Sequence, residues 1–192
     1  MANNFFAYLS KMRYIKRWAL MRNSIEENLS EHSLDTAYIA HALAVIGKKR
    51  LGKAVDDKKI VFRAMYHDCS EIFTGDLPTP VKYNNPEIKK AYKDIEKVAE
   101  EKLLKLLPVD MADEYSEFFG DNADEYTEKI VWAADKMSAL IKCIQEEKTG
   151  NREFIKAKQA LLQTIHDKNI AEAEIFIKEF LPAYNLTIDE MD

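Results

Sequence analysis

Apolar residues recur along this chain at the three- and four-residue spacing of amphipathic helices. No segment shows the alternation of apolar and polar residues that is typical of a half-buried strand. Turn-forming residues seldom interrupt the pattern, since the 192 residues include 5 Gly and 5 Pro. The pattern therefore predicts an all-α fold, with helices over 5–20, from 28 or 30 to 47, from 56 or 57 to 73, 86–107, 124–148, and one or two more within 152–180.

Start and stop signals set several of these boundaries. Asn28 with Glu31 three residues later resembles a capping box, and Gly47 stands where a C-terminal glycine is expected. Two prolines within 75–80 predict a stiff, non-helical loop, and 111–122 is of uncertain form. Between the caps of the second predicted helix, one stripe carries Leu34, Tyr38, His41 and Val45.

The composition indicates an ordinary globular protein, with 47% hydrophobic and 32% charged residues. The length fits a compact single domain, which we assign to 1–192. The net charge of -5 argues against binding to polymeric nucleic acid, which requires a basic face. The two cysteines form no disulfide framework, and we find neither a signal peptide nor a run long enough to span a bilayer. We therefore expect a cytoplasmic protein without membrane contact.

Ionisable residues interrupt the apolar face of the third predicted helix. Ile60, Ala64, His67 and Glu71 follow one another at i, i+4, i+7 and i+11, a stripe that normally faces the core. Asp68 lies directly beside this stripe. A single histidine at such a position is usually a hydrogen-bonded core residue, so the chemistry depends on what else converges there.

Two further residues complete a candidate metal site. Asp135 stands among apolar residues of the fifth predicted helix, where a lone carboxylate is costly to bury. It could be paired with a basic residue or exposed, or it could bind a metal. His32 sits in the first turn of the second predicted helix. Together with His67 and Asp68 these residues supply two imidazoles and two carboxylates, a mixed set that suits Mn, Co or a similar transition metal, with Zn also possible.

Short motifs around these residues resemble a known family. Glu31-His32-Ser33, Tyr66-His67-Asp68 and Ala134-Asp135 are similar to the H…HD…D signature of the HD-domain phosphohydrolases. The resemblance narrows to the YfbR-like bacterial 5'-deoxynucleotidases through four segments, 16–23, 27–34, 64–71 and 74–83. It covers nearly the whole chain, although beyond Gly150 it is loose.

The resemblance implies a compact helical bundle of the HD type, usually a homodimer. Such enzymes remove the 5'-phosphate from deoxyribonucleoside 5'-monophosphates and use one divalent metal cation. By matching position, the metal ligands would be His32, His67, Asp68 and Asp135. Glu71 would be the catalytic acidic residue, Arg17 would orient the phosphate, and Trp18 would pack where a 2'-hydroxyl would otherwise sit. The nucleotide pocket would be lined by Asp76, Leu77, Pro78 and Thr79.

Two alternatives stay open at this point. Other HD phosphohydrolases cleave nucleoside triphosphates, cyclic dinucleotides or guanosine alarmones. A protein with the same fold could also bind a nucleotide as a sensor without turnover. The intact ligand set together with Glu71 argues against the sensor. The sequence does not decide the native metal, the base preference, or whether Glu71 acts as base or acid.

Overall fold

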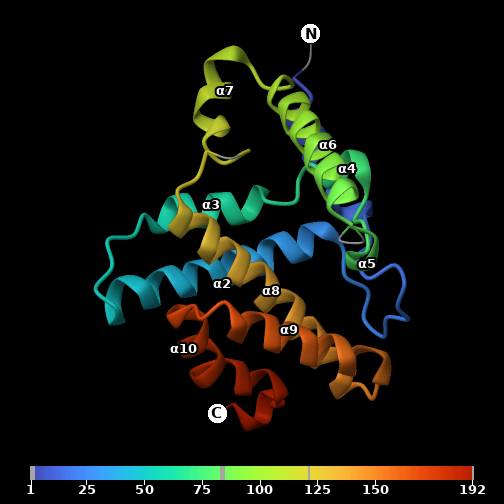
Figure 1. Cartoon of the computed structure of the whole chain (residues 1–192), viewed down its shortest axis with the longest axis vertical. Helices are drawn as coiled ribbons and strands as arrows, with labels where there is room; N and C mark the ends of the chain where they lie inside the picture. Colours follow the sequence, from blue (N-terminus) through green and yellow to red (C-terminus); the bar gives the residue numbers. More distant parts are fainter. Residues whose placement is uncertain (1–2, 83–84, 121, 192) are drawn as a thin grey trace.

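Two long helices, α2 (Leu29–Arg50) and α8 (Glu125–Lys148), lie against each other at the centre of the molecule (Figure 1). The computed structural model describes residues 3–82, 85–120 and 122–191, and this part contains no strand apart from one isolated bridge. The prediction of an all-α fold is confirmed. The other elements are α1 (Phe5–Leu9), η1 (Ser10–Tyr14), α3 (Asp57–Tyr66), α4 (Glu71–Thr74), α5 (Thr79–Lys82), α6 (Pro86–Leu104), α7 (Val109–Ser116), η2 (Arg152–Phe154), α9 (Ile155–Asp167), α10 (Ala171–Glu179), η3 (Leu181–Asn185) and η4 (Ile188–Glu190).

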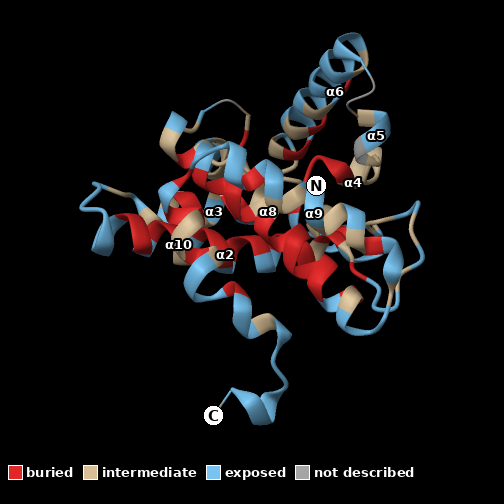
Figure 2. Ribbon diagram, turned by 60° about the horizontal axis from the view of Figure 1, so that its bottom comes forward, coloured by how far each residue is buried: buried red, intermediate tan, exposed pale blue. Residues whose placement is uncertain are grey.

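Two clusters of buried side chains hold these helices together. The main core lies between α2, α3, α8, α9 and α10, and its most deeply buried members include Leu43, Ile60, Met137, Leu140 and Ile165. Each such side chain contributes roughly 1.5–3 kcal/mol to folding. A second core joins the N-terminal segment to α6 and α7 through Phe5, Leu29, Cys69, Leu103 and Phe119. Figure 2 shows the buried positions concentrated along α2 and α8, whereas α6 is exposed over much of its length.

The first predicted helix is wrong beyond Tyr14. The structure has short helical turns up to that residue and then an irregular segment over 15–28. The Arg17 amide donates to the Glu27 carbonyl oxygen at 3.0 Å, so the segment folds back on itself. Trp18 has a φ of 61°, which no helix accepts. Pairing between residues ten apart therefore replaces the helical hydrogen bonds.

The third predicted helix is interrupted at the HD dipeptide. α3 ends at Tyr66, and α4 begins only at Glu71 after a turn that contains His67 and Asp68. The proposed stripe is thus not one continuous helix face. Glu71 is nevertheless buried, with an exposed fraction of 3%.

Other boundaries also differ from the sequence prediction. α2 runs through Gly47 to Arg50, so Gly47 does not cap this helix. Glycine stands there for another reason, since an added Cβ would overlap the Tyr126 hydroxyl of α8. α6 ends at Leu104 rather than 107, and the loop over 75–80 contains the start of α5. The uncertain stretch 111–122 is in part helical, within α7. The stripe of Leu34, Tyr38, His41 and Val45 faces outward.

None of the described helices is long and apolar enough to cross a membrane.

Candidate metal centre

Four side chains that can ligate a metal converge where α2, α8 and the turn between α3 and α4 meet. His32 comes from the first turn of α2, Asp135 from α8, and His67 and Asp68 from the turn. One donor atom of each lies within 4.8 Å of the other three. The His32 Nε2–Asp135 Oδ1 and His67 Nε2–Asp68 Oδ2 distances are both 3.1 Å. The structure therefore brings together all four residues that the sequence suggested as ligands.

The sequence fixes these positions through local structure and core packing. The Asn28 side chain accepts hydrogen bonds from the Ser30 and Glu31 amides, which sets where α2 begins and hence where His32 points. Asp135 follows Ala134, a fully buried residue of the main core. Asp68 precedes Cys69 of the second core. The site thus lies at the boundary between the two cores.

Both histidines are oriented through their second ring nitrogen. His67 Nδ1 lies 2.7 Å from the Ala64 carbonyl oxygen, and His32 Nδ1 lies 3.2 Å from Ser138 Oγ. A carbonyl oxygen only accepts, so His67 carries its hydrogen on Nδ1 and its neutral form offers the Nε2 lone pair to the site. Such hydrogen bonds are typical of metal-ligating histidines.

The donor set fits a divalent cation. The Nε2 atoms of His32 and His67 are buried and have no hydrogen-bond partner among the described residues. Each faces a carboxylate oxygen at 3.1 Å, and two lone pairs cannot satisfy one another. A bound cation would accept lone pairs from both imidazole nitrogens and both carboxylates at once. Two imidazoles with two carboxylates match the preference of a transition metal rather than of calcium.

The carboxylates of this cluster are ionised. Burial by itself would raise the pKa of Asp68, but a positive charge on the adjacent His67 outweighs burial and holds that pKa well below its ordinary value; a bound cation would supply the same stabilisation with His67 neutral. Burial of Asp135 is likewise outweighed by Lys136 and His32, which keep the pKa of Asp135 well below the usual range. Two partly buried negative charges therefore face the two imidazoles, as cation binding requires.

Arg17 lies at the edge of this cluster. Its side chain is 12% exposed, and Nη1 lies 3.5 Å from Asp68 Oδ2 and 3.9 Å from Asp76 Oδ1. Its guanidinium is therefore close to the ligands and held by their charges. The pKa of Arg17 is raised: burial opposes this shift, but Asp68 and Asp135 outweigh it.

Trp18 follows Arg17 and is held on two sides. Its Nε1 hydrogen is donated to Glu27 Oε2 at 2.7 Å, and its ring lies 5.3 Å from the ring of Phe154. A partly open cavity of about 350 Å³ lies beside both residues, and its lining includes Arg17, Trp18, Asn23 and Glu27. The two residues suggested for phosphate and sugar thus border one cavity.

Glu71 is a buried carboxyl beside the cluster. Burial first, and then the charges of Asp68 and Asp76, raise the pKa of Glu71 to about 9, although Lys82 opposes the shift. Lys82 Nζ lies 3.8 Å from Glu71 Oε1, and Glu71 Oε2 has no hydrogen-bond partner among the described residues. Burial therefore favours the protonated form of this carboxyl, and one of its two oxygens has no hydrogen-bond partner among the described residues.

The other suggested pocket residues lie between α4 and α5. Asp76 contacts Arg17, while Leu77 and Pro78 are half-buried in this segment. The side chain of Thr79 lies outside the described part of the structure. Tyr92 on α6 donates its hydroxyl hydrogen to the Gly75 carbonyl oxygen at 3.3 Å, which ties the segment to α6.

Sequence reasoning missed two residues of this region. Ser138 lies three positions after Asp135 on the buried face of α8, and this polar residue on an apolar face was an available signal. Glu27 gave none. It stands next to Glu26 in the sequence, yet the Glu27 side chain is 10% exposed while the Glu26 side chain is 72% exposed.

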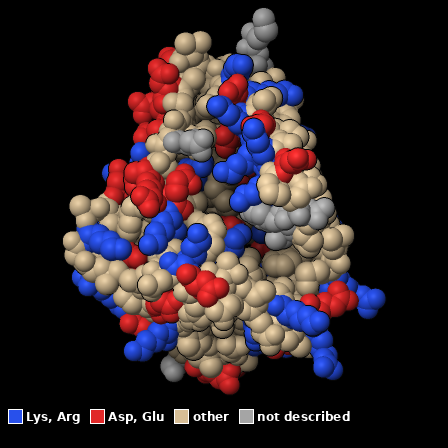
Figure 3. Space-filling model, in the orientation of Figure 1, with Lys and Arg blue, Asp and Glu red and all other residues tan. Residues whose placement is uncertain are grey.

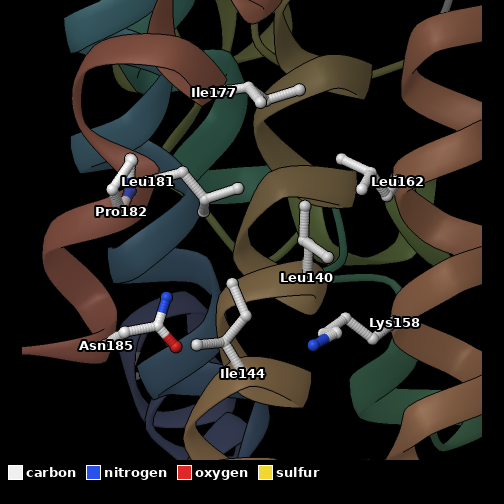
Figure 4. Close-up of a pocket in the computed structure, with 8 residues that line it drawn as sticks. All are labelled: Leu140, Ile144, Lys158, Leu162, Ile177, Leu181, Pro182 and Asn185. Atoms are coloured by element: carbon white, nitrogen blue, oxygen red, sulfur yellow. The ribbon is translucent and has the colours of Figure 1, made fainter.

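Other features of the surface lie away from the ligand cluster. A cavity of about 290 Å³ between α8, α9 and η3 is mainly apolar and contains none of the suggested site residues; Figure 4 shows Leu140, Leu162 and Leu181 among its lining. Figure 3 shows one face hollowed beside α6, with Lys and Arg side chains around the hollow. Positive charge thus gathers locally despite the net charge of -5.

The helical bundle and the cluster of two histidines and two aspartates define an HD-domain phosphohydrolase. The solved structure of an HD-domain phosphohydrolase from Listeria innocua matches with a TM-score of 0.82 and 27% identity, over 94% of this chain and 88% of that one. The cyanophage S-2L HD phosphohydrolase, solved with dA and one catalytic Zn²⁺, shares the fold with a TM-score of 0.68 at 16% identity, over 92% of this chain and 95% of that one.

The sequence comparisons narrow this class to one family. The family model described as 5'-deoxynucleotidase YfbR-like matches residues 4–184. A 5'-deoxynucleotidase of Vibrio cholerae is 46% identical over 190 residues, with 98% of each chain covered. Another, of Photorhabdus laumondii, is 45% identical, with 98% of this chain and 96% of the relative covered. The chain belongs to the YfbR-like 5'-deoxynucleotidase family, and the resemblance seen in its motifs is confirmed.

Proposed function

We propose that this chain is a metal-dependent 5'-deoxynucleotidase. It hydrolyses deoxyribonucleoside 5'-monophosphates to deoxyribonucleosides and phosphate. The observation that carries the proposal is the convergence of His32, His67, Asp68 and Asp135, with the guanidinium of Arg17 at its edge. Membership of the YfbR-like family supports the choice of substrate.

The four clustered residues would hold one divalent cation, and the unpartnered Nε2 atoms support this assignment. Co, Mn or a similar transition metal suits the ligands, and Zn is compatible with them. When bound, such a cation supplies Lewis acidity to a phosphoryl oxygen and makes water a better nucleophile at neutral pH.

Arg17 orients the phosphate in this proposal, and Glu71 transfers a proton. In hydrolysis, the oxygen of water forms a bond to phosphorus, the bond from phosphorus to the 5'-oxygen breaks, and a proton reaches the leaving oxygen. The planar fork of Arg17 matches the oxygens of a phosphate and orients it. Glu71 moves a proton in this reaction, because its buried carboxyl beside the ligands has one oxygen without a hydrogen-bond partner among the described residues.

Trp18 and the segment after α4 select the substrate. The indole of Trp18 borders the same cavity as Arg17, so a ribose 2'-hydroxyl placed against it would be rejected by shape and left unpaired. Asp76, Leu77, Pro78 and Thr79 would line the nucleotide pocket. This assignment is supported by the 3.9 Å distance between Arg17 Nη1 and Asp76 Oδ1.

We further propose that the protein is a cytoplasmic homodimer and that 1–192 forms one HD domain. Polymeric nucleic acid is not a partner in this proposal, since the net charge is -5. The family match over residues 4–184 supports the single domain.

Phosphate release from a substrate panel tests the proposed function. The panel contains 5'-deoxy- and 5'-ribonucleoside monophosphates, 3'-monophosphates and triphosphates, with chelated protein resupplied separately with Mn, Co, Zn or Mg. We expect turnover of the 5'-deoxy monophosphates, restored by a transition metal. Turnover of triphosphates in their place would overturn the substrate, and an absence of turnover with every metal would overturn the enzymatic role.

A further inference from the structure

Glu27 connects the two residues that the proposed function uses for phosphate and sugar. Its carboxylate oxygen Oε2 accepts the Nε1 hydrogen of Trp18 at 2.7 Å and lies 3.5 Å from Nε of Arg17. We propose that Glu27 is a positioning residue that sets the guanidinium of Arg17 and the indole of Trp18 in one fixed relation, and so contributes to deoxy selectivity. This inference rests on the proposed function.

Glu27 is itself held in place. The Arg17 amide donates to its carbonyl oxygen at 3.0 Å, and the neighbouring residues Lys16 and Asn28 form an isolated bridge. The Leu29 amide, at the start of α2, donates to the Ile15 carbonyl oxygen at 2.9 Å. The strand-like pairing joins the segment that carries Arg17 and Trp18 to the start of α2. Glu27 therefore holds the side chains of Arg17 and Trp18 in a fixed position relative to the start of α2.

Trp18 requires such support because of its backbone. A φ of 61° in a non-glycine residue with a bulky side chain costs about 1–3 kcal/mol and persists only where the surroundings enforce it. The hydrogen bond to Glu27 holds the polar edge of the indole, and the ring of Phe154 at 5.3 Å supports its apolar part. Loss of the first contact leaves the ring held on one side only.

Arg17 requires support for a different reason. Its guanidinium is surrounded by Asp68, Asp76 and Glu27, and its Nη1 faces the first two. The ion pair at Nε with Glu27 leaves the outer nitrogens for the cavity and the ligand cluster. Without this ion pair the guanidinium of Arg17 can rotate toward Asp68 or Asp76. A rotated fork no longer matches two phosphate oxygens.

Three variants separate the two contacts. Glu27→Gln keeps a hydrogen-bond acceptor for Trp18 but removes the charge that faces Arg17. Trp18→Phe removes the Nε1 donor and retains an aromatic ring. Glu27→Ala removes both contacts, together with the 3.9 Å approach of Glu27 Oε1 to His32 Nδ1, so the metal content of this variant is measured alongside its kinetics. Glu114→Gln is the control, because Glu114 is an exposed carboxylate on α7 and lines neither cavity.

The expected results follow from these contacts. Glu27→Ala lowers the ratio of kcat/KM for deoxy over ribo monophosphates by about tenfold, the value of one hydrogen bond to a charged group. Glu27→Gln raises KM with a smaller change in that ratio, because the Trp18 contact survives. Glu114→Gln leaves both parameters as in the unmodified protein. A purely structural role for Glu27 would lower activity on both substrates equally.

A second measurement needs no substrate. The chain has two tryptophans, so its ¹H–¹⁵N spectrum has two indole signals, which Trp132→Phe assigns. We expect the Trp18 signal to move upfield in Glu27→Ala and to stay in place in Glu114→Gln. An unmoved signal together with an unchanged deoxy-to-ribo ratio in Glu27→Ala would overturn the inference. If Glu27→Ala does not fold, the inference is tested instead by the KM and by the deoxy-to-ribo ratio of kcat/KM in Glu27→Gln and Trp18→Phe. A wild-type protein without turnover refutes the proposed function, whereas the indole signal still reports on the contact.

Discussion

His67 donates its Nδ1 hydrogen to the Ala64 carbonyl oxygen at 2.7 Å, and this bond turns its Nε2 toward the other ligands. Ala64 lies on the last full turn of α3 and is completely buried. The main core therefore orients a ligand of the proposed metal centre, and the break of the helix after Tyr66 allows it.

Replacement of either aspartate of the cluster tests the ligand set. Asp68→Ala and Asp135→Ala each remove one of the two carboxylates of the ligand set, so we expect loss of metal binding and of turnover together. Metal content after dialysis and phosphate release measure the two effects. Asp94→Ala on the exposed face of α6 is the control. Full activity in either ligand variant would refute the assignment.

Glu71→Gln separates proton transfer from metal binding. The substitution keeps the size of the side chain but removes the titrating group, so we expect retention of the metal and a loss of kcat of about 10²–10⁴-fold. Steady-state kinetics and metal analysis on the same sample check this. Loss of the metal along with the rate would instead place Glu71 among the ligands.

Trp18→Ala tests the sugar discrimination. Removal of the indole opens the cavity beside Arg17, and we expect ribonucleoside monophosphates to gain about 10–100-fold in kcat/KM relative to the deoxy substrates. The comparison is made on pairs of substrates with the same base. An unchanged deoxy-to-ribo ratio would contradict the role assigned to this residue.

Gly47→Ala tests the close approach of α2, α8 and α10. An added Cβ would overlap the Tyr126 hydroxyl and lie 3.0 Å from Glu172 Oε1, so we expect a loss of about 1–3 kcal/mol in the free energy of unfolding. Urea unfolding measures the loss. Tyr126→Phe removes the obstructing hydroxyl, and in that background Gly47→Ala should cost less. Equal costs in both backgrounds would exclude the steric explanation.

We expect the carboxylate of Glu146 to make part of the free energy of unfolding sensitive to acid. It accepts hydrogen bonds from the Ser24 and Ile25 amides and from Asn151, and it pairs with Lys142. Burial opposes ionisation, but Lys142 and these hydrogen bonds lower its pKa from 4.5 to about 2.

Because the folded-state pKa lies below the unfolded value, this contribution is present above about pH 4.5 and is lost as the pH falls toward 2. Glu146→Gln should show a smaller decrease of unfolding free energy across that window, measured by urea unfolding at several pH values. Glu153, which is exposed and accepts from the Arg22 amide, provides the control Glu153→Gln. Parallel curves for the unmodified protein and Glu146→Gln would contradict this prediction.

The sequence by itself determined the helical class, the extent of α8 and the start of α2. The start of α2 depends on Asn28 and Glu31, which lie three residues apart and satisfy the amides of one helical turn. The residues suggested as ligands were also readable, because ionisable side chains are costly on an apolar helix face unless something binds them. Local periodicity and local capping carry this information within a few residues.

Only the tertiary structure decided the rest. The helix break after Tyr66, the outward direction of the stripe that contains Tyr38, and the place of Gly47 inside α2 all depend on what packs against them. Glu26 and Glu27 are identical and adjacent in the sequence, yet one is exposed and the other binds Trp18. Trp18 lies nine residues before Glu27, across an irregular segment, and a periodic pattern of helix positions does not show which of two neighbouring carboxylates such a partner reaches.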